Sequence, residues 1–241
     1  MTFLDIAKRI LPYDFRQKLK RKLFHVNDMT ARLENLRNAG FKCTGFIDGG
    51  AYQGEWTSQF WRVFPESPSL LVEPLPGKQQ ALELIAQSIK GSVAITAALG
   101  RTSGIARFRV GETNSAVVGA TEEVAGNSIE VRLATLDELL ETAISFQPNL
   151  LKLDLQGYEL ECMEGCRDLA EKFEVIVIEI SLIPIGGAPL FTQVDNYLDT
   201  RGYRIYDVIP QYYRPLDGSL WQCDAIYVRK DSALLASTRW E

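Results

Sequence analysis

Histidine and cysteine are scarce in this 241-residue chain, which has one histidine, His25, and four cysteines. Cys162 and Cys166 are four residues apart and could share one face of a helix, but no histidine or second cysteine pair completes a zinc ligand set. Cys43 and Cys223 stand apart from them in the sequence. We therefore expect buried free thiols in a reducing cytoplasm, and we expect His25 at the surface unless an N-terminal helix brings it to a site.

The chain also lacks long apolar runs and an excess of basic charge. No run approaches the roughly 20 apolar residues of a membrane-spanning helix, and the N-terminus lacks the uninterrupted hydrophobic centre of a signal peptide. The net charge of −5 argues against a nucleic-acid partner, whose footprint would be strongly basic. With 46% hydrophobic residues, the chain can bury the core of one domain with a terminal appendage.

The appendage is the helical pattern of residues 1–40, which precedes a domain at 41–241. Residues 1–22 carry seven basic and two acidic side chains on an amphipathic pattern, a net charge of +5. Such a segment can lie on an anionic membrane, but we favour a solvated cap that packs on the core through its apolar side. A second helix is expected at Met29 to Asn38, with Gly40 as its C-cap.

From Cys43 onward, predicted strands and helices alternate, which favours an α/β domain with a mostly parallel sheet. The expected strands are 43–48, 69–73, 93–99, 150–155 and 174–180. One helix is expected to follow the first strand and end at residue 64, and the others are expected at 76–89, 136–144, 158–169 and 191–200. Two stretches break the alternation. Residues 105–110 and 128–133 predict an antiparallel pair around a polar loop, and 203–208 with 222–229 predict an antiparallel pair at one edge of the sheet.

The first predicted strand runs into a glycine turn that opens a helix, which is where doubly wound α/β domains bind nucleotide-like cofactors. The order is Asp48-Gly49-Gly50-Ala51, then Gln53-Gly54 and Thr57. This spacing does not fit the G-x-G-x-x-G fingerprint of dinucleotide sites. The pattern acid-x-Gly-x-x-x-Gly resembles motif I of class I S-adenosylmethionine-dependent methyltransferases, although a glycine turn of purely structural origin is the alternative.

Two further positions suit an adenosyl group. Glu73, followed by Pro74, closes the second strand 25 residues after Asp48, where a carboxylate can accept hydrogen bonds from both ribose hydroxyls. The alternative is a solvated charge at a strand end. Ala98 and Leu99 belong to a run of small and apolar residues that leaves room for a flat adenine.

Several motifs together resemble the FkbM family of S-adenosylmethionine-dependent methyltransferases. The matching stretches are Asp48-Gly49-Gly50-Ala51 with Gly54, Glu73-Pro74, Ala98-Leu99-Gly100, Thr135-Leu136-Asp137-Glu138-Leu139, Lys152-Leu153-Asp154 through Glu159 with Gly165, and Asp224 to Arg229. They occur in the family's order over residues 43–230, and residues 1–40 lie outside them. Gly49 departs mildly from the family's pattern, which often has an apolar residue there.

The resemblance implies a class I methyltransferase Rossmann-like fold: a mostly parallel seven-stranded sheet with an antiparallel terminal hairpin and helices on both faces. It also implies methyl transfer from S-adenosylmethionine to a hydroxyl of a sugar, glycan or polyketide-type small molecule. Asp154, at the carboxyl end of the fourth strand, is the first candidate for base or substrate anchor, and Glu159 and Glu179 could join it. These acids could also hold Mg²⁺, but pairing with a basic group such as Lys152 is favoured, so no metal ligand is assigned.

Acceptor contacts are expected from segments inserted into the common sheet. Asn114 and Ser115 lie in a polar loop suited to a polyol, and Tyr212 with Arg214 offers an aromatic face and a fork of donors. A flexible stretch at 185–188 follows the fifth strand. Two rival functions remain open: a dinucleotide-dependent oxidoreductase and a non-catalytic module that binds S-adenosylmethionine.

Overall fold

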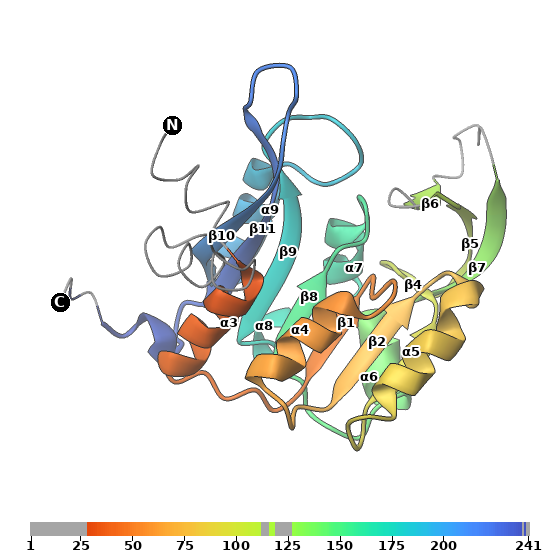
Figure 1. Cartoon of the computed structure of the whole chain (residues 1–241), viewed down its shortest axis with the longest axis horizontal. Coiled ribbons are helices and arrows are strands. Elements are labelled where there is room, and N and C mark those ends of the chain that lie inside the picture. Colours follow the sequence, from red (N-terminus) through yellow and green to blue (C-terminus); the bar gives the residue numbers. More distant parts are fainter. Residues whose placement is uncertain (1–27, 112–115, 119–126, 238, 240–241) are drawn as a thin grey trace, which may run out of the picture.

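The computed structural model describes residues 28–111, 116–118, 127–237 and 239 (Figure 1). Residues 1–22, His25, Asn114 and Ser115 lie outside these ranges, so the predictions that concern them stay predictions. The helices are α3 (Met29–Asn38), α4 (Glu55–Val63), α5 (Gln79–Ala86), α6 (Leu136–Thr142), α7 (Glu159–Glu164), α8 (Leu169–Lys172) and α9 (Phe191–Asp199), with 3₁₀ turns at Pro76–Lys78 and Ala233–Leu235. None of the helices in the described ranges is long and apolar enough to cross a membrane.

A seven-stranded sheet forms the centre of the molecule. Its order is β10-β11-β9-β8-β1-β2-β3. The strands are β1 (Phe46–Gly49), β2 (Ser69–Glu73), β3 (Val93–Thr96), β8 (Leu150–Leu153), β9 (Val175–Ser181), β10 (Tyr203–Tyr213) and β11 (Leu220–Arg229). Neighbouring strands pair in parallel except at β11, which runs antiparallel to both β9 and β10. The mostly parallel sheet and its antiparallel terminal pair are therefore confirmed.

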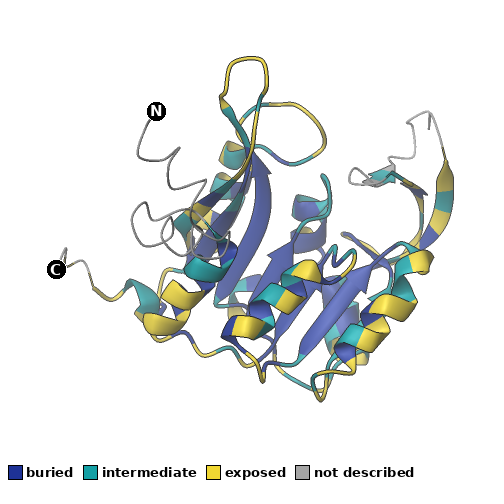
Figure 2. Cartoon of the chain, in the orientation of Figure 1, coloured by how far each residue is buried: buried dark blue, intermediate teal, exposed yellow. Residues whose placement is uncertain are grey.

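Helices cover both faces of this sheet (Figure 1). One face packs against α6 to α9 through residues such as Leu136, Met163 and Val194. The opposite face packs against α3 and α4 through Leu33 and Phe60. Because the strands are buried on both sides, β8 and β9 read as nearly continuous apolar runs, and the sheet is the dark blue centre of Figure 2.

A second sheet extends from the carboxyl end of β2 and β3. Its order is β4-β7-β5-β6, with β4 (Ala98–Leu99), β5 (Gly104–Arg109), β6 (Ala116–Val118) and β7 (Ser128–Ala134). The antiparallel pairing of β5 with β7 confirms the predicted pair. The single strand predicted at 93–99 is wrong in one respect: the chain leaves the main sheet after Thr96, and β4 pairs with β7 in the second sheet.

The helix predicted at 158–169 is interrupted, which is a second correction. It divides into α7 and α8, and Gly165 ends α7. A β-carbon on Gly165 would lie 2.3 Å from the carbonyl oxygen of Gly100, so α7 and the segment after β4 touch backbone to backbone there. Met163 of α7 and Leu169 of α8 both belong to the buried cluster of the main sheet.

The helix predicted at Met29 to Asn38 is confirmed, and it belongs to the core. Asp28 caps α3 by accepting a hydrogen bond from the N–H of Thr30, and Gly40 follows with φ 106°. Met29, Leu33 and Leu36 are buried in the same cluster as β1 and β8. The apolar face of α3 therefore covers the sheet, and the division of the chain at residue 40 stays a prediction.

Candidate functional site

The turn after β1 holds its backbone against the turn after β8. Gly50 has φ 77°, and a β-carbon there would lie 1.9 Å from the carbonyl oxygen of Asp154. Only glycine fits such an approach in the left-handed region. Asp48 is fully buried and accepts a hydrogen bond from the hydroxyl of Thr57 at 2.6 Å, which ties the strand to α4.

Glu73 closes the same turn from the neighbouring strand. Its carboxylate accepts hydrogen bonds from the N–H groups of Tyr52 at 2.9 Å and Leu75 at 3.0 Å. Burial raises the pKa of Glu73 above its usual range, against the opposing effect of these two bonds. Tyr52 has a left-handed φ of 47°, and the ammonium of Lys78 lies 3.9 Å from its ring centre.

A row of charges crosses the sheet where the apolar contacts with α3 and α4 end. The residues are Asp48 on β1, Lys152 on β8, Glu179 on β9 and Asp224 on β11. Each is two positions from an apolar residue on the same face, because side chains alternate along a strand. The row therefore lies at the carboxyl edge of the parallel strands.

Lys152 is the cation of this row. Its ammonium lies 3.4 Å from Asp48 Oδ1 and 3.5 Å from Asp154 Oδ2, and it is almost fully buried. Burial disfavours the charge, but Asp154, Asp48 and Asp224 outweigh burial and raise the pKa of Lys152 above its usual range. Lys152 and Asp154 thus form an ion pair next to the glycine turn.

The segment after β8 brings three polar side chains together. Gln156, with a left-handed φ of 54°, donates from Nε2 to Asp154 Oδ1 at 2.8 Å and to Glu179 Oε2 at 3.1 Å. Glu159 is fully buried and accepts from the N–H groups of Leu155 and Gly157 at 2.7 and 3.0 Å. The left-handed backbone of Gln156 is strained, and such strain is typical of functional sites where the surrounding structure holds a residue in place.

Burial and neighbouring carboxylates suppress ionisation in this cluster. Burial, reinforced by Asp154, Glu159 and Asp224 and opposed by Lys152, raises the pKa of Glu179 to about 9. Burial raises the pKa of Glu159 to about 7 and that of Asp224 to about 6. Lys152 opposes these shifts at Glu179 and Asp224, but its ammonium is already paired with Asp48.

Asp154, Gln156 and Glu179 line a cavity of about 600 Å³. Six predicted cofactor residues line it, as do two others predicted for catalysis or substrate: Gly50, Glu73, Pro74, Ala98, Leu99, Asp154, Glu179 and Tyr212. The other predicted residues of the glycine turn do not; these are Asp48, Gly49, Ala51, Gln53, Gly54 and Thr57. Gln53 is exposed and the remaining five are buried beneath the turn, where they shape it.

Two more predicted residues lie away from the cavity. Glu159 is buried beneath the loop after β8. Its two carboxylate oxygens accept hydrogen bonds from backbone N–H groups of this loop, so they hold it in place. Arg214 forms an ion pair with Asp217 at the tip of the β10–β11 hairpin. Neither side chain lines the cavity, so neither faces the space that a ligand would occupy.

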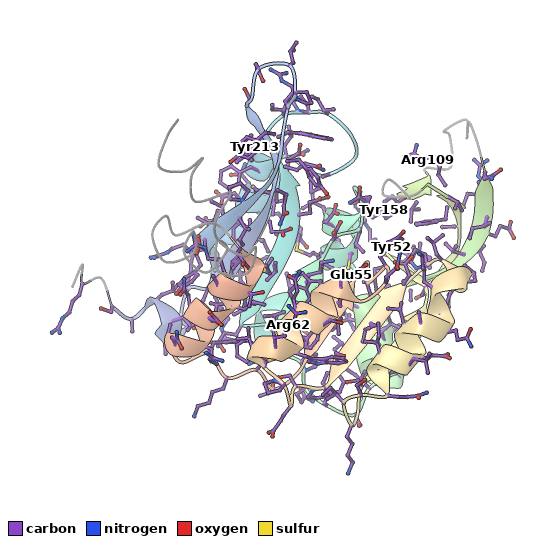
Figure 3. All side chains as sticks on the ribbon, in the orientation of Figure 1. Tyr52, Glu55, Arg62, Arg109, Tyr158 and Tyr213 are labelled. Atoms are coloured by element: carbon purple, nitrogen blue, oxygen red, sulfur yellow. The ribbon has the colours of Figure 1, made fainter. Side chains whose placement is uncertain are left out.

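The cavity has walls that the sequence did not predict. Trp221 and Gln222 of β11 join Tyr212 on one side, and Phe108, Arg109 and Val117 of the second sheet face them. Tyr52 and Tyr158 lie between these walls, with Arg109 on the facing strand (Figure 3). No spacing rule marks these residues.

The acids of the site do not form a metal centre. Within the part of the chain that the structure describes, no group of three or more His, Cys, Asp or Glu side chains is arranged to hold a metal ion. The expected pairing of a carboxylate with Lys152 is present. The possible Mg²⁺ thus has no support among the described residues.

Comparison with protein families identifies the chain. The sequence pattern of the methyltransferase FkbM domain matches residues 48–205, which is more than half of the 241 residues. The chain belongs to the FkbM methyltransferase family. Its fold is the class I methyltransferase Rossmann-like fold, and the family makes it an S-adenosylmethionine-dependent methyltransferase.

Solved structures with a similar course of the chain are methyltransferases too. Magnesium protoporphyrin IX methyltransferase from Synechocystis PCC 6803, solved with bound S-adenosylmethionine, is 10% identical with a TM-score of 0.48, over 83% of this chain and 76% of that one. Precorrin-6y C5,15-methyltransferase from Geobacter metallireducens GS-15 is 10% identical with a TM-score of 0.47, over 83% and 86%. Neither likeness is close enough to identify an acceptor. The comparison with curated proteins finds no match.

The cavity of this FkbM-family chain fits the cofactor of its family. Its volume lies within the roughly 300–1,000 Å³ of small-molecule sites. Glu73 presents a carboxylate to the cavity that can accept further hydrogen bonds, and Ala97, Ala98 and Leu99 provide a small apolar surface. The close backbone approach at Gly50 leaves no side chain between the turn and Asp154.

Proposed function

We propose that the chain transfers a methyl group from S-adenosylmethionine to a hydroxyl oxygen of a small molecule, a sugar or a glycan. The observation that carries this proposal is the arrangement of one cavity along the carboxyl edge of the sheet, with Glu73 on one side and Asp154 with Glu179 on the other. Three strand spacings separate β2 from β9, which is about 14 Å. One cavity thus has room for a nucleoside and an acceptor together.

The cofactor half of the site uses β1, β2 and β4. Glu73 would accept hydrogen bonds from the ribose hydroxyls, and Pro74 with Ala98 and Leu99 would contact the adenine. Gly50 would leave space for the methionine part. The buried groups Asp48, Thr57 and Gly54 support this half from behind, because they fix the turn.

The acceptor half uses Asp154, which follows β8, and residues of β9, β10 and β11. Asp154 reaches the cavity from a chain segment that is fixed by Lys152 and Gln156, and we assign it the role of base toward the acceptor hydroxyl. Tyr212 and Trp221, whose ring centres are 6.4 Å apart, would contact a sugar or ring system. Holding two reactants at near-attack distance can supply roughly 7–11 kcal/mol of the barrier.

Two further observations favour a small acceptor and a cytoplasmic location for the protein. The net charge of −5 favours a small molecule or glycan over a nucleic acid. The four cysteines are unpaired, as expected in a reducing compartment.

Product analysis tests the proposal. The protein is incubated with S-adenosylmethionine and pools of glycans or small-molecule extracts, and mass spectrometry should detect a product heavier by one CH₂ group. Asp154→Asn should retain S-adenosylhomocysteine binding and lose most of this product. A preference for NADH over S-adenosylmethionine in a binding titration would instead favour an oxidoreductase.

Adjacent tyrosines give a matched control for the acceptor half. Tyr212 and Tyr213 are equally exposed, at 58%, but only Tyr212 lines the cavity. Tyr212→Ala should raise the KM for the acceptor, whereas Tyr213→Ala should not. Equal effects of the two substitutions on this KM would contradict the predicted contact between Tyr212 and the acceptor.

A further inference from the structure

One amide joins two carboxyl groups in the cavity. Gln156 Nε2 lies 2.8 Å from Asp154 Oδ1 and 3.1 Å from Glu179 Oε2, and all three side chains line the same cavity. An NH₂ group can donate to both acceptors at once. The two carboxyl groups are therefore held close together as a pair.

The surroundings of the pair contain more acid than base. Asp224 of β11 is the direct neighbour of Glu179 across the sheet, and Glu159 of α7 lies behind the loop. Asp48 of β1 already occupies Lys152, the cation next to Asp154. Glu73 of β2 adds a further acid to the cavity wall, and Arg109 of β5 lines the opposite wall.

Two like charges that share one amide and one lysine do not both ionise readily near neutral pH. The high pKa of Glu179 agrees with this geometry, since that side chain is only 6% exposed whereas the Asp154 side chain is 36% exposed. Burial and the neighbouring carboxylates therefore favour the protonated form of Glu179, which Gln156 holds next to Asp154.

We propose that Asp154 and Glu179 act as one proton-sharing pair, positioned by Gln156, whose single negative charge faces the cofactor and takes up the proton of the acceptor hydroxyl. This inference rests on the proposed function. S-adenosylmethionine supplies the methyl group together with a positive charge, and its sulfur keeps the electron pair of the broken C–S bond. The acceptor O–H bond breaks, its oxygen bonds to the methyl carbon, and the proton binds an Oδ atom of Asp154.

The pair keeps the charge of the cavity balanced through this step. Before it, the carboxylate of Asp154 offsets one positive charge of the cofactor. Afterwards the cofactor has lost that charge, and Asp154 is a neutral acid. Glu179 stays protonated throughout, so no second negative charge remains after the positive one is gone.

The pH dependence of cofactor discrimination tests the pair without an acceptor. Calorimetry on the full-length protein gives the ratio of the Kd for S-adenosylhomocysteine to the Kd for S-adenosylmethionine between pH 6 and 10. Deprotonation of Glu179 adds a negative charge that favours the cationic ligand, so the ratio should rise about 10-fold or more with pH. Glu179→Gln cannot gain this charge and should show a flat ratio once the titration of the ligands themselves is subtracted.

Two variants complete the experiment. Glu66→Gln makes the same substitution at an exposed acid outside the cavity and should keep the wild-type rise. Gln156→Gly preserves the left-handed backbone and removes the amide, which stabilises the charged carboxylates, so the rise should move to higher pH. A merely structural role for Gln156 would change both affinities without moving this midpoint.

The possible failures are distinguishable. If both ligands bind and Glu179→Gln keeps the wild-type rise, the proton-sharing pair is wrong while the proposed function stands. The same conclusion follows if the rise does not move in Gln156→Gly. If neither ligand binds the folded protein, the proposed function fails and the pair fails with it.

Discussion

At the scale of single residues, Gly50 joins the two halves of the site. A β-carbon there would meet the carbonyl oxygen of Asp154 at 1.9 Å, and the φ of 77° is unfavourable for other residues. The backbone of Asp154 cannot move away easily, since it directly follows the buried strand β8 and its N–H donates to the carbonyl oxygen of Gly49 at 3.1 Å. The residue thus sets both the shape of the cofactor turn and the position of the proposed base.

We predict that Gly50→Ala lowers the affinity for S-adenosylhomocysteine at least about 10-fold and destabilises the fold by roughly 1–3 kcal/mol. Calorimetry and thermal unfolding measure the two effects. Gly218→Ala is the matched control for backbone strain, because it has φ 72° with open space around it, and Gly77→Ala has neither strain nor clash. Wild-type affinity in Gly50→Ala would contradict the placement of the cofactor.

Glu179 gives a prediction for stability. Its pKa is raised from 4.5 to about 9 on folding, so the unfolded chain releases a proton between these values that the folded protein retains. The contribution of Glu179 to the free energy of unfolding therefore falls by about 1.4 kcal/mol per pH unit in this window and levels off above pH 9. Glu179→Gln has no carboxyl group at this position and should not show this pH-dependent loss of stability. Its melting temperature should match the wild type near pH 4 and exceed it increasingly toward pH 9, and a constant difference across this range would contradict the burial argument.

The sequence predicted some of these residues because their types and spacing carry chemistry. Glu73 and Asp154 end strands next to glycine turns, and both line the cavity. Gln156 and Trp221 could not be found in this way, since their positions depend on a left-handed turn and on the register of β11 against β9. Thr57 was assigned to the cofactor because it lies in the motif, but its hydroxyl serves Asp48.

At the scale of elements, local signals predicted the helices that have clear caps. Thr135 is a favoured N-cap residue type directly before α6, and its hydroxyl accepts a hydrogen bond from the N–H of Glu138 at 3.1 Å. The breaks at Ala97 and Gly165 were missed because they arise from contacts between distant segments: β4 pairs with β7, and Gly165 touches Gly100. Apolar periodicity continues through both points, so it could not reveal them.

The cap supports a prediction that separates stability from binding. Thr135→Ala should lower the free energy of unfolding by about 1 kcal/mol, because the N–H of Glu138 loses its acceptor. S-adenosylhomocysteine affinity should be unchanged, since Thr135 does not line the cavity. Thr135→Ser keeps the hydroxyl and should restore stability. If Ser were no better than Ala, the hydroxyl would not be the stabilising group.

At the scale of the whole molecule, the described cavity draws its walls from residues 50–222. Residues 1–22 lie outside the described chain, so their role remains a prediction. We expect that deleting them leaves the affinity for S-adenosylhomocysteine within about twofold, because the cavity-lining residues remain in the truncated protein. A larger loss of affinity in calorimetry would show that the basic segment closes over the site. Deletion through residue 40 should instead destabilise the fold, since α3 buries Leu33 and Leu36 against the sheet.

The mostly parallel seven-stranded sheet, the helices on both faces and the terminal hairpin were predictable from the alternation of elements and from the family resemblance. The shape of the acceptor half was not, because the second sheet and the β10–β11 hairpin reach the cavity from sequence positions with no distinctive motif. The proposed function depends most on the cofactor half of the cavity, where residues predicted from the sequence motifs line the wall.

Calorimetric titration of the full-length protein with S-adenosylhomocysteine tests this half most directly, with Glu73→Ala measured alongside. We predict one site per chain and an affinity at least about 10-fold weaker in the variant, because the ribose hydroxyls lose their carboxylate acceptor. No binding to the folded wild-type protein, or equal affinity of the two proteins, would contradict the account.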